Sequence, residues 1–473
     1  MATWTGRSSG ERWNYKTVIP GGSMGIGRSV ANVVLATGLA CAAMGATAIT
    51  PEELARLDSD LTPVGAERAG NAAGTIPTWT GGLAQRTLDP NIGYIDPYAD
   101  DRVLFTITAT NADQYADQLA PGHREMFRQF PASYRMHVYP TRRSANWPEA
   151  VLEQVKLQAP LARTRGYELL DVGRTAVPFP ITTDPLQMMW NHSLRWRGGS
   201  VKRVYSWFPV DRRGRYFAVR VLDTVAWDQQ GYMKESRPNR LANFYAMYLA
   251  PANIEGQLTL VWEPVNPVAD SRQAWTYQTV TRRVVRVPSL AYDDLDRRTQ
   301  GLRTTDQYDG WNGAPDLYDW TLVGKREMFI PYNSYRLTSK RLKYADILQP
   351  GHLNPDLLRY ELHRVWVIEA TLRPGKHHRY PRRTFYLDED TWQVSMEEDY
   401  NSEGALWRFG SHPAMQFYDV LVPWYAAMVH HDFESGAYLA SDLENESSIA
   451  RSWGWKGDIN DFLPVNLRRL GTR

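Results

Sequence analysis

The spacing of hydrophobic residues changes near residue 200 of this 473-residue chain. Before that point, apolar side chains recur three and four positions apart, as at Val151, Leu152, Val155 and Ala159, a spacing that predicts amphipathic helices. After it, β-branched and aromatic residues alternate with polar ones, which predicts strands. The predicted helices are residues 51–61, 111–130, 148–162 and 185–196, and the predicted strands are residues 204–210, 216–225, 258–265, 273–287 and 319–331.

The alternation is clearest from residue 360 to residue 409, which we expect to form four more strands. Turn-forming segments separate them at Pro374-Gly375, at residues 388–390 and at residues 401–404. Loops this short join antiparallel neighbours, so we predict a meander and not a parallel α/β sheet. The chain has no repeat of fixed period, which argues against a solenoid or a propeller. The fold class expected is therefore α+β, mainly antiparallel β.

One face of this meander is regularly apolar and is our candidate ligand-binding surface. Two interpretations stay open, because such a face either packs on helices as an ordinary sheet core or holds a hydrophobic ligand on a curved sheet. The candidate ligand-binding residues are Trp366, Ile368, Ala370 and Leu372 on the first strand, Phe385 and Leu387 on the second, and Trp392 and Val394 on the third.

Residues 24–48 have the pattern of a secretory signal peptide. A single Arg28 precedes an uncharged run from Val30, and Ala46-Thr47-Ala48 is a small-x-small cleavage site. Met24 is then the expected initiator. A membrane anchor would need about 20 strongly apolar residues, more than this run supplies. Acylation of Cys41 is the other alternative, which would anchor the protein to a membrane.

Composition narrows the function of the remaining chain. Residues 49–473 carry 50 basic and 51 acidic residues, so there is no basic field to bind nucleic acid. Cys41 is the only cysteine and lies in the leader, so the exported chain has no internal disulfide. We expect residues 49–100, rich in Gly, Pro, Asn and Asp, to form an extended arm and residues 101–473 to form one β-rich domain.

No recognisable motif carries catalytic chemistry. The Gly21-Gly22-Ser23-Met24-Gly25 match to a hydrolase elbow lies in or before the leader, where no folded sheet can present the serine. No phosphate-binding or dinucleotide-binding glycine loop is present. His377-His378 and His430-His431 are adjacent pairs, whose side chains point to opposite faces of a strand, so neither pair chelates a metal by itself. We predict no catalytic residue, no cofactor and no metal site.

Acidic clusters leave one enzymatic alternative open. They lie at residues 293–294, 388–390 and 397–399, and two carboxylates among so many tryptophans would suit a glycosidase. The first two clusters fall in predicted loops, where acidic residues are common in turns.

Several segments resemble a bacterial family of unknown function whose members are often described as outer membrane lipoprotein-sorting proteins. The resemblance is strongest across residues 361–370 and 383–392, and it covers nearly the whole exported chain in order. The other matching segments are residues 61–71, 76–82, 178–180, 190–192, 309–310 and 315–331.

The resemblance implies a fold like that of the periplasmic lipoprotein carriers, a half-open antiparallel barrel wrapped around helices with an interior that accepts acyl chains. It also implies a resistance-nodulation-division-type inner-membrane transporter as a partner, because genes of this family tend to lie beside such transporters. We therefore expect a non-enzymatic periplasmic carrier or accessory protein for lipid or another hydrophobic compound, with outer-membrane association open. The alternatives are an envelope hydrolase acting on lipid or glycan and a structural envelope protein with a filled core.

Export gives the first testable prediction. Because residues 24–48 form a cleavable signal, the mature protein should begin at Ile49 and be recovered in the periplasmic fraction. N-terminal sequencing of protein from its native host measures this directly. An intact Val30 in the membrane fraction, or an acylated Cys41, would contradict cleavage.

Overall fold

The computed structural model describes residues 49–89, 92–287 and 292–471. The predicted signal peptide, with Met24 and Cys41, lies outside these ranges. The helices are α1 (Pro51–Ala55), α2 (Pro121–Gln129), α3 (Glu149–Gln158), α4 (Pro185–Leu194), α5 (Tyr344–Ile347) and α6 (Leu467–Gly471). None of the helices in these ranges is both long and apolar enough to cross a membrane.

Strands dominate the described chain. Those of the first half are β1 (Phe105–Ile107), β2 (Met136–Val138), β3 (Arg163–Arg165), β4 (Glu168–Leu170), β5 (Ser200–Val210), β6 (Val219–Trp227), β7 (Ala242–Ala250), β8 (Leu258–Glu263), β9 (Gln273–Gln278) and β10 (Arg283–Val287). Those of the second half are β11 (Tyr318–Pro331), β12 (Tyr360–Leu372), β13 (Arg382–Asp388), β14 (Val394–Tyr400), β15 (Leu406–Ser411), β16 (Ala414–Phe417), β17 (Val422–Tyr425), β18 (Met428–Asp432), β19 (Ala437–Leu443) and β20 (Ser452–Trp453).

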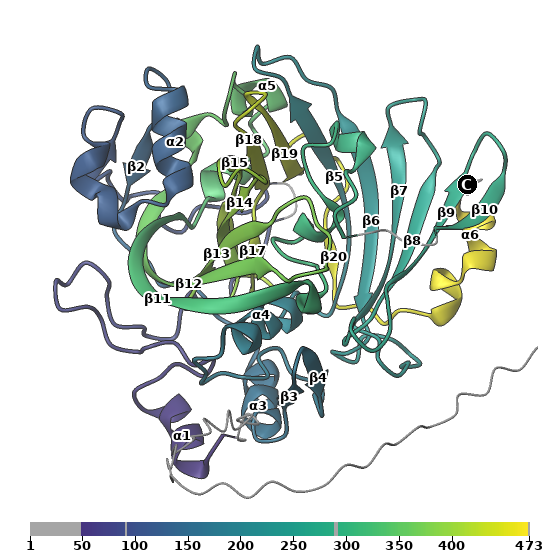
Figure 1. The fold of residues 1–473 in the computed structure, drawn as a ribbon, viewed down its shortest axis with the longest axis horizontal. Coiled ribbons are helices and arrows are strands. Elements are labelled where there is room, and N and C mark those ends of the chain that lie inside the picture. Colours follow the sequence, from purple (N-terminus) through teal and green to yellow (C-terminus); the bar gives the residue numbers. More distant parts are fainter. Residues whose placement is uncertain (1–48, 90–91, 288–291, 472–473) are drawn as a thin grey trace, which may run out of the picture. The chain divides into compact units, whose positions relative to one another are not determined.

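Sixteen of these strands form one sheet, in the order β1-β2-β12-β13-β14-β15-β18-β19-β5-β6-β7-β8-β9-β10, with β11 beside β12 and β20 beside β5. Every pairing is antiparallel except the short one between β2 and β12. The two ends of this order do not pair with each other, so the curved sheet stays open and does not close into a barrel (Figure 1). The predicted fold class, mainly antiparallel β with a half-open sheet, is confirmed.

The meander β12–β15 is covered on both faces. On one face, Ile368, Phe385 and Val394 belong to a core that includes most of α4. On the other, Val367 and Met396 belong to a second core, which includes Met126 of α2 together with residues of β1 and β2. Side chains that alternate along each strand therefore all find apolar surroundings, the pattern of a sheet lying between two layers.

Two predicted elements are each divided in the structure, and one further strand was not predicted. The helix expected over 111–130 is divided into a 3₁₀ segment, Ala112–Gln118, and α2, because Pro121 favours an extended residue before it and opens the new helix. The strand expected over 273–287 is the hairpin β9–β10. β7 was not predicted, since its sequence ANFYAMYLA is apolar almost throughout and shows no clear alternation.

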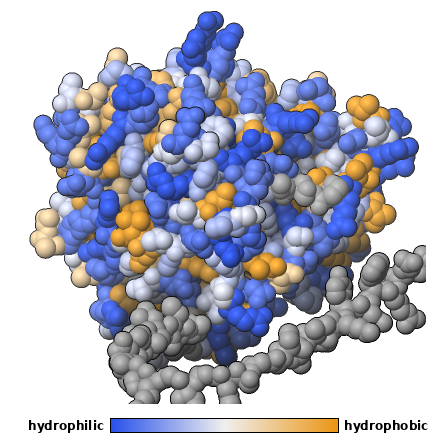
Figure 2. Space-filling view, in the orientation of Figure 1, coloured by the Kyte–Doolittle hydropathy of each residue, from blue (hydrophilic) through white to orange (hydrophobic). Residues whose placement is uncertain are grey.

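The sheet continues from β5 to β10 as a second meander. Figure 1 shows β5–β10 standing side by side, with the C-terminal α6 against the last strands. On one face of this meander, hydrophobic side chains pack against α6 and the loop before it. On the opposite face, which we call the inner face, they form a separate cluster that includes Leu302. The molecular surface in Figure 2 is mostly hydrophilic, with hydrophobic residues scattered among polar ones.

Candidate functional site

The structure brings the predicted ligand-binding residues together in one hydrophobic cluster. Ile368, Ala370, Phe385, Leu387 and Val394 are 0 % exposed and Trp392 is 1 % exposed. Trp366 and Leu372 pack against the same cluster and are partly buried. The eight residues therefore share one cluster, although Trp392 lies in the turn before β14 and not on the strand.

Protein side chains fill the space over this face. The indole of Trp392 donates to the carbonyl of Val64 at 2.8 Å, and the amide of Val394 donates to Nδ1 of His192 on α4 at 3.1 Å. The ring of Trp311 packs edge-on against Phe385, with centroids 5.3 Å apart. A ligand would have to displace these groups to touch Ile368, and its contact with this face stays a prediction.

A hollow lies instead on the inner face of β5–β8. Residues two apart on a strand share a face, and registers such as Val225 opposite Phe244 and Phe244 opposite Val261 align these faces across the sheet. The resulting cleft has a volume of about 100 Å³. Its sheet side is lined by Tyr205, Trp207, Phe244, Ala246, Tyr248, Thr259 and Val261.

The segment 292–312, which we call the strap, forms the other wall of this cleft. Tyr308 stacks on Phe244 at a centroid distance of 6.3 Å, and its hydroxyl lies 3.3 Å from that of Tyr205. The guanidinium of Arg298 lies 4.3 Å from the ring centre of Tyr248, and that of Arg303 lies 5.1 Å from Trp207. These cation–π contacts fix the strap to the aromatic face while leaving space between them.

Two arginines give the cleft a polar end. Arg298 and Arg303 both approach Asp296, at 3.4 and 3.8 Å. Nη1 of Arg303 is buried and has no hydrogen-bond partner among the described residues. A buried donor of this kind is costly when unsatisfied, so an acceptor atom on a ligand would stabilise it. Burial also raises the pKa of Tyr308 above its ordinary value, which keeps that hydroxyl neutral.

A neighbouring hollow of about 50 Å³ continues the cleft toward Trp227 and Trp424. The two hollows share Phe244, Glu263, Tyr308 and Asn312. Sequence reasoning missed this region because β7 and the strap lack a distinctive pattern. The only signal available was the run of aromatic residues at alternate positions in Tyr205, Trp207, Phe244 and Tyr248.

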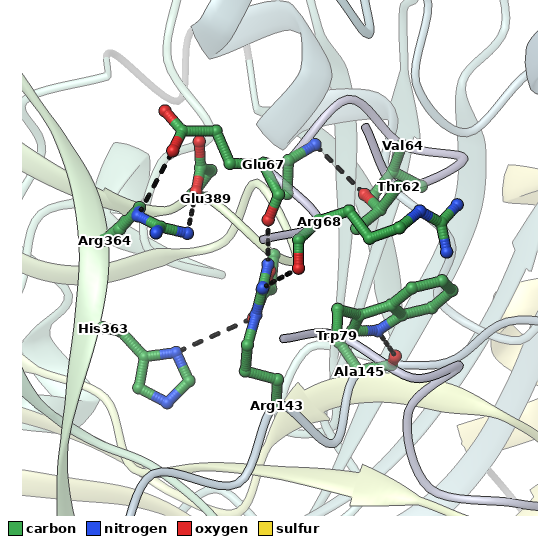
Figure 3. A network of polar contacts seen from close by, with 12 residues as sticks. Thr62, Val64, Glu67, Arg68, Trp79, Arg143, Ala145, His363, Arg364 and Glu389 are labelled. Atoms are coloured by element: carbon green, nitrogen blue, oxygen red, sulfur yellow. Dashed lines mark hydrogen bonds and ion pairs between the residues drawn. The ribbon is translucent and has the colours of Figure 1, made fainter. Parts of the chain in front are cut away.

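A buried ionic cluster joins the N-terminal segment to the meander (Figure 3). Arg143 makes two hydrogen bonds to the carboxylate of Asp390, at 2.9 and 2.6 Å, and donates to the backbone carbonyls of Glu67 and Arg68. The indole of Trp79 donates to the carbonyl of Ala145 at 3.2 Å. Residues 62–79 are thus held against the strands by buried hydrogen bonds.

His363 lies inside this cluster among three carboxylates. Its Nε2 is 3.3 Å from Glu361, and its Nδ1 is 3.5 Å from Asp388 and 3.9 Å from Asp390. Burial opposes the charged ring, but hydrogen bonds and charge attraction from Asp388 and Glu361 outweigh it and raise the pKa of His363 to about 9. His363 thus lies in a buried network of charge contacts with these carboxylates.

Two of the carboxylates considered for a glycosidase are buried and paired with arginines. Asp390 and Glu397 are 4 % and 0 % exposed, and each is engaged by an arginine. Asp293 and Asp294 lie in the strap.

The protein is thus an open antiparallel sheet with an aromatic cleft beneath a strap. Comparison with known sequences shows the family to which it belongs. The chain belongs to the family described as "Protein of unknown function (DUF1329)", which it matches over residues 106–468. The resemblance seen in the sequence is thereby confirmed. The uncharacterized protein PA3922 of Pseudomonas aeruginosa is 43 % identical over 452 residues, which cover 93 % of this chain and 99 % of that protein.

Two solved structures with some similarity share 12–13 % of the aligned sequence. An outer membrane lipoprotein-sorting protein domain, as described for Vibrio parahaemolyticus, matches 58 % of this chain and 93 % of its own at a TM-score of 0.40 and 13 % identity. The LolA superfamily protein NE2245 from Nitrosomonas europaea matches 60 % of this chain and 98 % of its own at a TM-score of 0.36 and 12 % identity. At TM-scores below 0.5, we draw nothing about this chain's ligand from them.

Replacing Ile368 by Ala tests the filled core. The deleted atoms come from a side chain with no exposed surface, so the free energy of unfolding should fall by about 2–5 kcal/mol. Denaturant unfolding measures the change. Val323→Ala on β11, a residue that is 47 % exposed, is the control and should change stability by less than about 0.5 kcal/mol. Equal effects of the two variants would contradict the packing described.

The charged state of His363 predicts a pH dependence. Because its folded pKa of about 9 lies above the unfolded value of about 6.5, its stabilisation is complete below pH 6.5 and is lost as pH rises through 9. His363→Gln should therefore destabilise the protein most at pH 6.5, by on the order of 3 kcal/mol, and progressively less toward pH 9. Unfolding curves across this range measure the difference. His377→Gln, at a side chain 94 % exposed, is the control and should show no such trend.

Proposed function

We propose that this protein is a non-enzymatic periplasmic carrier or accessory protein that binds a lipid or another hydrophobic compound. The observation that carries the proposal is the aromatic cleft between the inner face of β5–β8 and the strap. Ligand sites of proteins are mostly apolar hollows with a few polar groups that orient the ligand, and the lining of this cleft has that composition.

The distribution of polar groups supports an amphipathic ligand. Trp207, Phe244 and Tyr248 offer apolar surface to a hydrocarbon chain, and Arg303 offers a donor without a partner among the described residues. A carboxylate, phosphate or ester oxygen would accept that hydrogen bond. The ligand proposed is therefore a molecule with an apolar body and an oxygen-rich head.

The filled face of β12–β14 is not the main binding site in this proposal. Its buried residues, such as Ile368 and Phe385, form the rigid core on which the sheet is built, and the cleft lies farther along the same sheet. Trp366 is partly buried at the margin of this core, and contact of a ligand with Trp366 remains part of the proposal as a second location.

Location and partner extend the proposal beyond the cleft. Periplasmic location rests on the signal-like sequence of residues 24–48. Delivery of the ligand to the outer membrane with a resistance-nodulation-division-type transporter rests on the family resemblance, and none of the contacts described above bears on it.

Filling the cleft tests the proposed site. Ala246 is a small residue in its wall, and Ala246→Phe should reduce the affinity for a fluorescent fatty acid at least about tenfold, because the added ring occupies the ligand's space. Fluorescence titration measures binding, and thermal unfolding checks that the variant is folded. Val285→Phe adds the same group at a residue 43 % exposed on β10 and should leave binding unchanged.

Lipid mass spectrometry on protein purified gently from its native periplasm gives the complementary measurement. The proposal fails if the wild-type protein binds no hydrophobic probe and releases no lipid on denaturation. Turnover of ester or glycan substrates, abolished by one substitution at Asp390, Glu397 or His363, would establish the hydrolase alternative instead. Absence of both binding and turnover would leave a structural envelope protein.

A further inference from the structure

A glycine in the middle of the large sheet brings a carboxylate and two histidines together. Gly410 on β15 pairs with Glu397 on β14 and with His430 on β18, so the three residues are in register across adjacent strands. Directly paired residues point to the same face. His412 lies just beyond the end of β15, and its ring centre is 5.1 Å from that of His430.

The missing side chain of Gly410 creates the space that these groups share. A Cβ atom at this position would lie 2.5 Å from Cγ of Glu397 and 2.9 Å from its Oε1. Any other residue would therefore push the carboxylate away. The glycine allows Glu397 and His430 to approach each other over the middle strand.

Both histidines are buried without partners. His412 and His430 are 0 % exposed, and no ring nitrogen of either makes a hydrogen bond to the described part of the chain. A neutral imidazole offers one ring nitrogen with a free lone pair to a metal ion. Leaving such atoms unsatisfied costs about 1–3 kcal/mol each, which a bound ligand would offset.

The distances suit coordination. Nε2 of His430 lies 3.4 Å from Oε1 of Glu397, and the ligand atoms of Glu397, His412 and His430 all lie within 4.8 Å of one another. Zinc–nitrogen and zinc–oxygen bonds of about 2.0–2.1 Å at a tetrahedral angle separate two ligand atoms by about 3.4 Å. The separation of His430 and Glu397 is therefore that of two ligands of one ion.

Carboxylates gather beside the proposed site. Asp306, Glu397 and Asp399 are buried around the guanidinium of Arg383, which contacts each of them at 2.6, 3.4 and 2.7 Å. The nearby Arg408 is paired with Asp432.

We propose that Glu397, His412 and His430 bind a divalent transition-metal ion, with zinc as the preferred ion. Two imidazoles and one carboxylate are a donor set that binds zinc and leaves the fourth position to water.

The proposed ion would link three strands and the strap. β14, β15 and β18 supply the ligands, and Gln307 of the strap donates from Nε2 to Glu397 at 2.9 Å and to Asp399 at 2.7 Å. Second-shell hydrogen bonds of this kind orient a carboxylate ligand. The site is independent of the ligand cleft, because none of its three side chains lines that hollow.

Metal analysis of the wild-type protein tests this site directly. Protein purified from zinc-supplemented cells should carry about one zinc ion per chain by inductively coupled plasma mass spectrometry. Adding zinc to the metal-free protein should raise its melting temperature. Cobalt(II) added instead should give the intense visible absorption of a tetrahedral site, a measurement that needs no variant.

Variants identify the ligands. His412→Asn and His430→Asn should each lower zinc affinity at least about tenfold. His431→Asn is the matched control, because His431 is the next residue on β18, is also buried without hydrogen bonds and points to the opposite face. The proposal is overturned if the wild type binds no zinc and gives only the weak spectrum of hydrated cobalt, or if His431→Asn loses zinc as strongly as His412→Asn. Probe binding in the cleft is measured separately, so neither result decides the other.

Discussion

The pairing of β19 with β5 holds the two halves of this protein in one sheet. It joins residues far apart in the sequence, with Leu439 opposite Pro209 and Ala440 opposite Phe208. On one side of this junction lie the meander β12–β15 and β18, and on the other lies the meander β5–β10. A sheet built by joining two local meanders forms the junction late, because its long loop must close before the contact stabilises it.

The strap extends across this junction and connects the two regions to which we assign functions. Tyr308 packs on Phe244 at the cleft, and the preceding residue, Gln307, binds the carboxylates of Glu397 and Asp399. The strap therefore contacts both the wall of the cleft and the carboxylate cluster.

Buried charge is the main cost of this architecture. Arg383, Asp306, Glu397 and Asp399 are all 0 % exposed, and desolvation of such groups costs several kcal/mol per ion unless each finds partners. Removing one partner of such a network is therefore expected to be more destabilising than removing a surface ion pair.

Local sequence determined much of the fold. The alternation of apolar and polar residues predicted the strands from Tyr360 to Ser411, their antiparallel order and the common face of Ile368, Phe385 and Val394, because side-chain direction in a strand follows from a period of two. The same pattern could not tell an open surface from a filled core, since both are apolar. Packing of α4 and Trp311 decided that. The cleft, the strap and the grouping of Glu397, His412 and His430 depend on which strands become neighbours, and this is set by contacts between residues distant in the chain.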